Sequence, residues 1–213
     1  MDREGRAFAV ARRVLGPSVM KRSLNGRLLP RLRAIASTLG PDARVLDVGA
    51  KNAPYRKYFR GVRFETVDVR PEVNPDFVAD VQELSRIVPC DSYDLVICTE
   101  VLEHVENPRL AVEEIRRILK PNGTLLATTP YIVPYHPDPR DYWRMTFEAW
   151  HSVLRDWSSA DVSAHGNRAL AVWYLLETGW GSPLRLLNPL VHRSCSWIKA
   201  GRVFLGIFVE ARR

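Results

Sequence analysis

Residues 44–50 read Arg44-Val45-Leu46-Asp47-Val48-Gly49-Ala50, and this stretch decides the fold. An apolar run ends in an acid, one further apolar residue and a glycine. This order predicts a buried strand whose C-terminal end opens into a turn that binds a ligand. In open α/β sheets, ligands lie beyond the carboxyl ends of the strands.

A second predicted strand, Phe64-Glu65-Thr66-Val67-Asp68, ends in another acid 21 residues after Asp47. A glycine-containing turn followed by an acid about 20 residues later is the general layout for binding a nucleoside, because its ribose hydroxyls bond a carboxylate. The two segments together predict a nucleoside-like cofactor.

Strand-like and helix-like segments alternate along the rest of the 213-residue chain. Apolar strands alternating with helices predict an α/β fold, in which a mostly parallel sheet is covered by helices on both faces. We divide the chain into a basic N-terminal helical extension, 1–40, and one domain, 41–213, with a helical lid or insertion at 165–202. The predicted strands are 44–49, 62–67, a short one ending near 78–80, 93–98, 124–128, 159–164 and 204–209. The predicted helices are 28–39, 55–59, 109–119 and 147–154.

Positive charge gathers at the two ends of the sequence. Residues 1–40 contain nine Arg or Lys residues and two acids. Residues 181–213 contain six Arg or Lys residues and one acid. Basic ends suggest an anionic surface or substrate near the termini, with a solvated basic face as the alternative. The chain shows no signal-peptide pattern and no apolar run of membrane-spanning length, and its three cysteines form no CxxC pair. We therefore expect a cytoplasmic protein.

Four motifs occur in the order and spacing of one known family. They are Val45–Gly49, the acid Asp68, Tyr93–His104 (YDLVICTEVLEH) and Leu119–Thr129 (LKPNGTLLATT). Together they resemble the class I S-adenosylmethionine-dependent methyltransferases, and more narrowly the small bacterial group related to ubiquinone and menaquinone methyltransferases. The resemblance covers about residues 41–165. It implies a Rossmann-like, doubly wound, seven-stranded sheet, with S-adenosylmethionine as cofactor and S-adenosylhomocysteine as product.

The resemblance also implies which residues hold the cofactor. The acid Asp47 would support its methionine end, Gly49 would let the backbone pass close to it, and Asp68 would accept hydrogen bonds from the ribose. The remaining implied neighbours are Ala50, Tyr55, Val69, Asp80, Val81, Glu100 and Val101.

The first turn departs from the family pattern. The family continues with further glycines, as in GxGxG, whereas this chain reads Gly49-Ala50-Lys51-Asn52-Ala53-Pro54-Tyr55. We expect Asn52 to adopt the positive φ that glycine often provides. A loss of cofactor binding stays open as an alternative.

Residues 130–146 form the most specific segment, rich in prolines, aromatic residues and charges. The segment resembles a P-x-x-P-x-H-x-x-P-x-D-[YF]-x-R-x-T signature of bacterial methyltransferases found with polysaccharide and natural-product enzymes. The catalytic candidates are His136 first and His104 second, with Asp141 either orienting the imidazole or binding a substrate hydroxyl. The residues expected to shape the acceptor pocket are Tyr131, Tyr142, Trp143 and Arg144. The structural interpretation is an Asp141–Arg144 pair and a helix N-cap at Thr146.

The implied reaction is methyl transfer to an oxygen of a small-molecule acceptor, sugar-containing or another secondary metabolite. An oxygen nucleophile needs a base near neutral pH, and His is suited to that role. No HExxH motif or Cys/His cluster is present, so we expect no metal. The absence of an Asn/Asp-Pro-Pro-Tyr motif disfavours nucleic acid.

Two other functions stay open: an RNA or protein methyltransferase that uses the basic termini, and a non-catalytic cofactor-binding or degenerate scaffold. The apolar, aromatic and basic segment 165–202 would cap the active site, pair two subunits or touch a membrane surface. A monomer and a homodimer are both compatible with the sequence.

Overall fold

The computed structural model describes residues 17–179 and 182–213, so residues 1–16 of the predicted extension lie outside it. The described chain forms two compact units. The sheet unit consists of residues 30–131, 135–163 and 207–213, and the helical unit of residues 17–29, 132–134 and 164–206. The predicted division into 1–40 and 41–213 stays a prediction.

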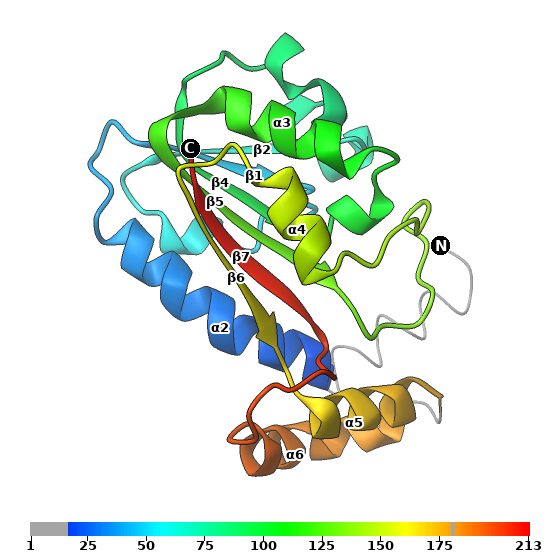
Figure 1. The fold of residues 1–213 in the computed structure, drawn as a ribbon. Helices are drawn as coiled ribbons and strands as arrows, with labels where there is room; N and C mark the ends of the chain where they lie inside the picture. Colours follow the sequence, from blue (N-terminus) through cyan, green and yellow to red (C-terminus); the bar gives the residue numbers. More distant parts are fainter. Residues whose placement is uncertain (1–16, 180–181) are drawn as a thin grey trace. The chain divides into compact units, whose positions relative to one another are not determined.

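The sheet has seven strands in the order β3-β2-β1-β4-β5-β7-β6 (Figure 1). The pairs β1–β2, β1–β4, β2–β3 and β4–β5 are parallel. The last residue of the chain, Arg213, bonds through its backbone to Asn122 and Gly123 near the start of β5, so β7 runs antiparallel to β5. The bounds are β1 Arg44–Val48, β2 Arg63–Asp68, β3 Phe77–Val78, β4 Tyr93–Thr99, β5 Leu119–Pro130, β6 Ser159–His165 and β7 Gly206–Arg212.

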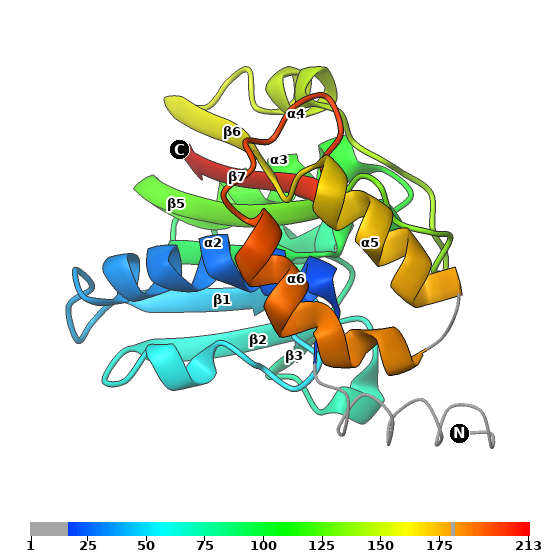
Figure 2. The ribbon, with the colours of Figure 1, turned by 90° about the horizontal axis from the view of Figure 1, so that it is seen from below.

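Helices cover both faces of this sheet, which confirms the predicted α/β fold. Helices α3 (Pro108–Ile118) and α4 (Phe147–Val153) lie on one face, and the C-terminal part of α2 (Val19–Ala36) lies on the other (Figure 2). The Thr146 hydroxyl accepts a hydrogen bond from Ala149 N–H, which confirms Thr146 as the N-cap of α4. The 3-10 helices are η1 Arg56–Tyr58, η2 Pro71–Val73, η3 Val81–Arg86 and η4 Leu102–His104.

The central strands form where they do because their side chains are apolar on both faces. Strand β1 is buried from Val45 to Val48, and Leu95–Cys98 of β4 is fully buried. A run without polar alternation suits a strand covered by helices on both sides. Val48, at the end of β1, lies opposite Val67 of β2 and Cys98 of β4, so these three strands end together.

Strand β5 and helix α2 begin well before their predicted first residues. Strand β5 begins at Leu119, directly after α3, and includes residues 120–123, which lie between the predicted helix 109–119 and the predicted strand 124–128. Its register with β4 shifts after Tyr93, and Asn122 has φ 65°, so residues 120–123 form an irregularity within the strand. Helix α2 begins at Val19 rather than 28 and contains Pro30, because the burial of Leu24, Leu28 and Leu32 outweighs the cost of the proline.

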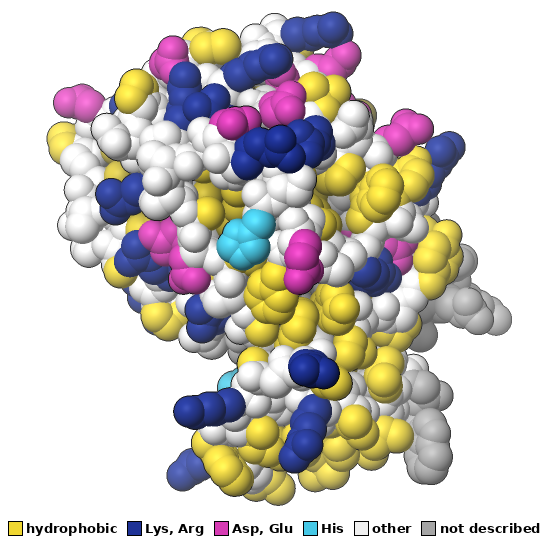
Figure 3. All heavy atoms as spheres, in the orientation of Figure 1, with side chains coloured by type: hydrophobic (Ala, Val, Ile, Leu, Met, Phe, Trp, Pro, Cys, Tyr) yellow, Lys and Arg dark blue, Asp and Glu magenta, His cyan; other side chains and the backbone are white. Residues whose placement is uncertain are grey.

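The helical unit consists mainly of α5 (Arg168–Gly179), η5 (Ser182–Leu187) and α6 (Asn188–Cys195). Its core is formed by Val19, Met20, Leu170, Ala171 and Leu205. The outer surface of these helices carries hydrophobic and basic side chains next to one another (Figure 3). The exposed apolar residues here are Val172, Leu175, Leu176, Leu186, Leu187, Leu190 and Trp197. Among the described residues, no helix is long and apolar enough to span a bilayer, and contact with a membrane surface stays a prediction.

Within the helical unit, His165 makes the fold sensitive to acid. Burial lowers the pKa of this imidazole to about 4, from an ordinary 6.5. The unfolded chain therefore binds more protons than the folded chain below pH 6.5, so stability is lost as the pH falls from about 6.5 to 4. We expect the free energy of unfolding to drop between pH 7 and pH 4 by about 3 kcal/mol more in the wild type than in His165→Gln.

Urea unfolding at several pH values measures this difference. The exposed His151, changed to Gln, is the matched control and should follow the wild-type curve. If the free energy of unfolding depended on pH in the same way in the wild type and in His165→Gln, His165 would not be the group that makes the fold sensitive to acid. His192, whose pKa burial also lowers, remains in both proteins and does not affect the comparison.

Candidate functional site

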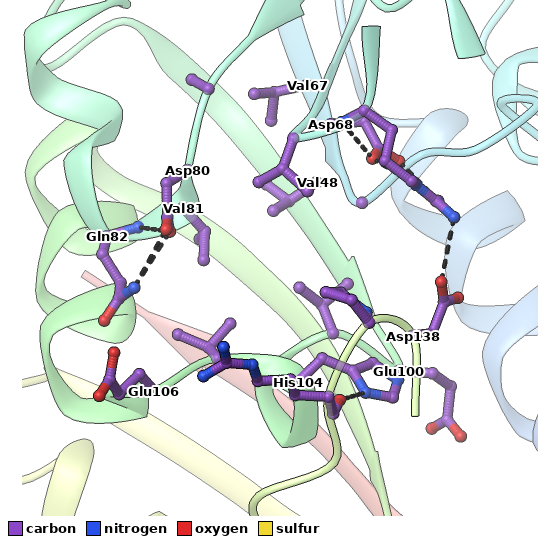
Figure 4. A pocket seen from close by; sticks show the side chains of 18 of the residues that line it. Val48, Val67, Asp68, Asp80, Val81, Gln82, Glu100, His104, Glu106 and Asp138 are labelled. Atoms are coloured by element: carbon purple, nitrogen blue, oxygen red, sulfur yellow. Dashed lines mark hydrogen bonds and ion pairs between the residues drawn. The ribbon is translucent and has the colours of Figure 1, made fainter. Parts of the chain in front are cut away.

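The carboxyl edge of the sheet unit contains a cavity of about 260 Å³. It lies where β1, β2 and β4 end, and the loops after these strands form its walls (Figure 4). Val48 and Val67 contribute apolar surface, while Asp68, Asp80 and Glu100 bring carboxylates from three different strand ends. The position is the one that the sequence predicted for a ligand.

The first turn approaches the cavity with its backbone. Gly49 has φ +64°, and its N–H donates to Val67 O at 2.8 Å. A Cβ atom placed on this glycine would lie 2.4 Å from Cγ2 of Val101, so only glycine fits here without displacement. The further positive φ angles of the turn fall on Lys51 (49°) and Ala53 (46°), so the expectation for Asn52 was wrong.

Asp68 receives several hydrogen bonds at the end of β2. The backbone N–H of Lys51 donates to it at 3.1 Å, and Arg70 donates from both its backbone N–H and its guanidinium. Burial would raise the pKa of the Asp68 carboxyl, but the hydrogen bonds from Arg70 and Lys51 outweigh burial and lower it. Asp68 is therefore an anion that faces the cavity.

The side chains of Lys51 and Arg70 also hold Asp138, which lies in the segment between β5 and α4. Lys51 Nζ lies 2.5 Å and Arg70 Nη1 3.1 Å from its carboxylate oxygens. Burial would raise the pKa of the Asp138 carboxyl, but the hydrogen bond from Lys51 and the nearby positive charges outweigh burial and lower this pKa. Ion pairs thus connect the Asp68 side of the cavity to this segment.

The opposite wall is built by Asp80 and its neighbours. The Asp80 carboxylate caps η3 by accepting a hydrogen bond from Gln82 N–H at 2.8 Å, and it also bonds Gln82 Nε2. Asp80 therefore caps a helix and lines the cavity with the same side chain. Of the other cofactor candidates, Val69, Val81, Glu100 and Val101 line the cavity.

Three predicted cofactor residues are buried beside the cavity without lining it: Asp47, Ala50 and Tyr55. The Tyr55 hydroxyl lies 3.1 Å from Thr99 Oγ1, and burial raises the pKa of this phenol to about 12. Among the predicted acceptor residues, Tyr142 lines the cavity, whereas Tyr131, Trp143 and Arg144 do not. The Trp143 indole donates to Val105 O.

A group of three side chains, Glu103, His104 and His136, adjoins the cavity. We call it the carboxylate–imidazole cluster. Nε2 of His104 and Nε2 of His136 lie 3.7 and 3.8 Å from the same oxygen, Oε1 of Glu103. The two rings are 5.2 Å apart and nearly perpendicular. His104 also lines the cavity, so the cluster and the cavity share a wall.

Each imidazole is oriented through its other nitrogen. His104 Nδ1 lies 2.5 Å from Arg140 O, and His136 Nδ1 lies 3.4 Å from Asp141 Oδ2. The Arg140 carbonyl only accepts hydrogen bonds, and at 2.5 Å it favours the proton on Nδ1 of His104 in the neutral ring. The Asp141 carboxylate favours the same tautomer for His136, and Nε2 of each ring then faces Glu103 without a proton.

Asp141 is held as an anion by Arg144. The Arg144 guanidinium contacts both carboxylate oxygens, at 2.5 and 2.7 Å, and these bonds lower the pKa of Asp141 to about 2. Asp141 also accepts a hydrogen bond from the backbone N–H of His136 at 3.0 Å. The predicted Asp141–Arg144 pair is confirmed, and it supports His136 at the same time.

Sequence reasoning missed four members of this site: Lys51, Arg70, Asp138 and Glu103. The two cations and Asp138 carry charge but belong to no motif that the chain shares with the family pattern. The ligand group Glu103, His104 and His136 was also unexpected, because its donor atoms, all within 4.8 Å of one another, come from segments more than 30 residues apart. The signal available in the sequence was the adjacent Glu103-His104 pair after β4.

Comparison with known proteins agrees with this geometry. Residues 20–170 match the family described as methyltransferase domain. A ubiquinone biosynthesis O-methyltransferase of Xanthomonas campestris pv. campestris (strain B100) is 33% identical over 116 residues, which are 46% of this chain and 48% of that protein. The chain thus spans about half the length of the curated relatives that it matches.

Solved structures share the fold at low sequence identity. A SAM-dependent methyltransferase from Archaeoglobus fulgidus superposes with a TM-score of 0.63 at 14% identity, covering 97% of this chain and 99% of the other. The [4+2]-cyclase SpnF superposes with a TM-score of 0.56 at 16% identity, covering 86% and 80%. The fold therefore carries more than one kind of chemistry, and the site residues must carry the functional argument.

The contact between Gly49 and Val101 leads to a stability test. We expect Gly49→Ala to lower the free energy of unfolding by about 2–3 kcal/mol, from the steric clash together with the left-handed backbone. In a Val101→Ala background the clash is removed, so the same change should cost about 1 kcal/mol.

Urea unfolding of the four proteins gives this double-mutant cycle. Gly40→Ala is the control, because a Cβ there meets nothing within 4 Å. Equal costs of Gly49→Ala in both backgrounds would show that Val101 does not press on the turn.

Proposed function

The chain belongs to the methyltransferase-domain family, and on that premise we propose that it transfers a methyl group from S-adenosylmethionine to an oxygen of a small-molecule acceptor. The observation that carries the proposal is that His104 belongs both to the cavity wall and to the carboxylate–imidazole cluster. A site for a nucleoside cofactor and a group able to take a proton thus lie side by side.

The residues of the cavity fit the nucleoside part of this cofactor. Asp68 would be an anionic acceptor for the two ribose hydroxyls, and Gly49, the only residue that fits beside Val101, would bring its bare backbone close to the cofactor. Asp80 would accept a hydrogen bond from the adenine amino group, while Val69 and Val81 would flank the ring. Lys51 carries a positive charge that suits the carboxylate of the methionine end.

The bound cofactor supplies an electrophilic methyl group on a positively charged sulfur. The chain has to align the acceptor oxygen and remove its proton. We assign proton removal to Nε2 of His136, because Asp141 holds the proton on Nδ1 and stabilises the charged ring that forms. Arg144 then acts as a positioning residue that keeps Asp141 anionic. His104 is the second candidate for the base.

The acceptor would bind beside His136, where Tyr131, Tyr142 and Trp143 provide aromatic surface. The His136 side chain is 38% exposed, so a substrate can reach it. The name of the Xanthomonas relatives, ubiquinone biosynthesis O-methyltransferase, supports an oxygen as the methylated atom. We propose a hydroxylated small molecule, sugar-containing or another secondary metabolite, as the acceptor.

The cofactor assignment predicts the effect of one substitution. Asp68→Ala removes the acceptor for the ribose hydroxyls, so we expect binding of S-adenosylhomocysteine to weaken by a factor of at least about 10. Isothermal titration with purified protein measures the affinity. Asp156→Ala, at an exposed acid outside the cavity, should bind as the wild type does. Unchanged affinity in Asp68→Ala would contradict the proposed cofactor site.

The base assignment predicts a different pattern. His136→Gln should leave S-adenosylhomocysteine binding intact and lower methyl transfer by about 10²–10⁴-fold, because a positioned base contributes that much. Transfer is followed with methyl-tritiated S-adenosylmethionine and a panel of phenols and nucleotide sugars. His151→Gln serves as control for the loss of an imidazole. An unchanged transfer rate in His136→Gln would rule out His136 as the base.

A further inference from the structure

Glu103 is a buried acid whose carboxylate accepts no hydrogen bond from the part of the chain that the structure describes. Its exposed fraction is 0%, and neither carboxylate oxygen has a hydrogen-bond partner among the residues that the structure describes. Buried carboxylates are normally hydrogen-bonded, paired with a cation or bound to a metal. The proposed role of His136 as the base does not explain why a buried carboxylate lies beside it.

The neighbours of Glu103 are suited to binding a cation together with it. One oxygen, Oε1, is approached by Nε2 of His104 and Nε2 of His136 at nearly the same distance, 3.7 and 3.8 Å. The tautomers argued above direct a lone pair from each of these nitrogens toward the space beside Oε1. Two imidazole nitrogens and one carboxylate oxygen form a donor set typical of zinc and other divalent transition ions.

The groups behind the two rings strengthen this interpretation. Metal-binding histidines usually donate their other N–H to a carboxylate or a backbone carbonyl, which fixes the ring and increases its basicity. Here Asp141 stands behind His136 and the carbonyl of Arg140 behind His104. Both types of supporting partner are thus present.

The distances from Oε1 of Glu103 to the two imidazole nitrogens require only a small adjustment, and all three donor atoms lie within 4.8 Å of one another. Ligands of a tetrahedral ion lie about 3.3 Å apart when each bond is about 2.0–2.1 Å long. The separations of 3.7 and 3.8 Å therefore need to shrink by about half an ångström, which rotation of the side chains can supply. The partly exposed His136 leaves a side open where a further ligand can reach an ion.

We propose that Glu103, His104 and His136 form a binding site for one divalent transition ion, with zinc as the best match to the donors. Its part in catalysis rests on the proposed function: the acceptor hydroxyl would bind the ion in the open position and lose its proton to solvent water. In the metal-loaded protein, His136 is then a ligand rather than the base. The hydroxyl oxygen forms the new bond to the methyl carbon, and the bond from that carbon to sulfur breaks with its electrons kept by sulfur.

Metal binding by the whole chain tests the proposal directly. Protein freed of metal by chelation is titrated with Zn²⁺ by calorimetry and with Co²⁺ by visible absorption, which reports nitrogen and oxygen ligands. We expect one Zn²⁺ per chain, and affinity at least about 10-fold lower in Glu103→Gln, His104→Gln and His136→Gln. Asp141→Asn should weaken binding by about 10–100-fold through the ring that it supports. His151→Gln, which also removes one imidazole, should bind as the wild type does, and Mg²⁺ should not compete.

Three results would overturn the site: no Zn²⁺ uptake by the wild type, uptake that the substitutions leave unchanged, or displacement of Zn²⁺ by equal Mg²⁺. If Glu103→Gln does not fold, the Co²⁺ spectrum of the wild type and the two histidine variants still decide the matter. S-adenosylhomocysteine binding to the metal-free protein separates the two proposals. If the metal-free protein binds S-adenosylhomocysteine but the protein takes up no Zn²⁺, only the proposed metal site is contradicted. If the protein takes up Zn²⁺ but does not bind S-adenosylhomocysteine, the proposed cofactor site is contradicted.

Discussion

The parallel pairing of β1 with both β2 and β4 is the constraint on which the rest of the structure depends. In this register Val48 lies opposite Val67 and Cys98, so three strands end at one line. The loops that follow start from that line and enclose the cavity. A slip of one residue would turn each buried side chain of β1 to the opposite face, and the packing on both faces excludes it. Core packing thus places the polar site.

The site in turn contains charges that the core would not otherwise hold. A carboxylate buried without compensation costs on the order of several kcal/mol, and Glu103 is fully buried. The charge of Arg144 acts on Glu103 through space, and the two imidazoles face it. Proteins keep such a local conflict mainly where a function needs it. The burial of Glu103 is therefore an argument for chemistry at this position rather than for stability.

The fold and the cavity follow from the sequence to the extent that they depend on local patterns. The apolar residues of β1 and β4 mark these strands in the sequence, and the acid at the end of β2 follows the first turn at a recognisable spacing. The positive φ angles of the turn did not follow. They fall on Lys51 and Ala53 because hydrogen bonds to Asp68 and Ala50 close the turn there, and those bonds exist only in the folded loop.

The carboxylate–imidazole cluster could not be predicted for a different reason. The position of Glu103 depends on a distant segment, because the N–H groups of Tyr142 and Trp143 both donate to the Glu103 carbonyl. His136 reaches the cluster only because that segment folds back onto η4 and because Asp141 and Arg144 hold it there. A single sequence shows the residues but not the contact between segments more than 30 residues apart.

The same segment connects the cofactor side of the site to the chemical side. Asp138 lies two residues after His136, and Lys51 and Arg70 hold it at the cavity. Arg70 also bonds Asp68, so a ligand that donates hydrogen bonds to Asp68 would compete with this guanidinium for the same carboxylate. Partly exposed ion pairs of this kind contribute about 1 kcal/mol or less each, so a bound ligand can rearrange them. A chain of ion pairs thus runs from Asp68 through Arg70 to Asp138, two residues after His136.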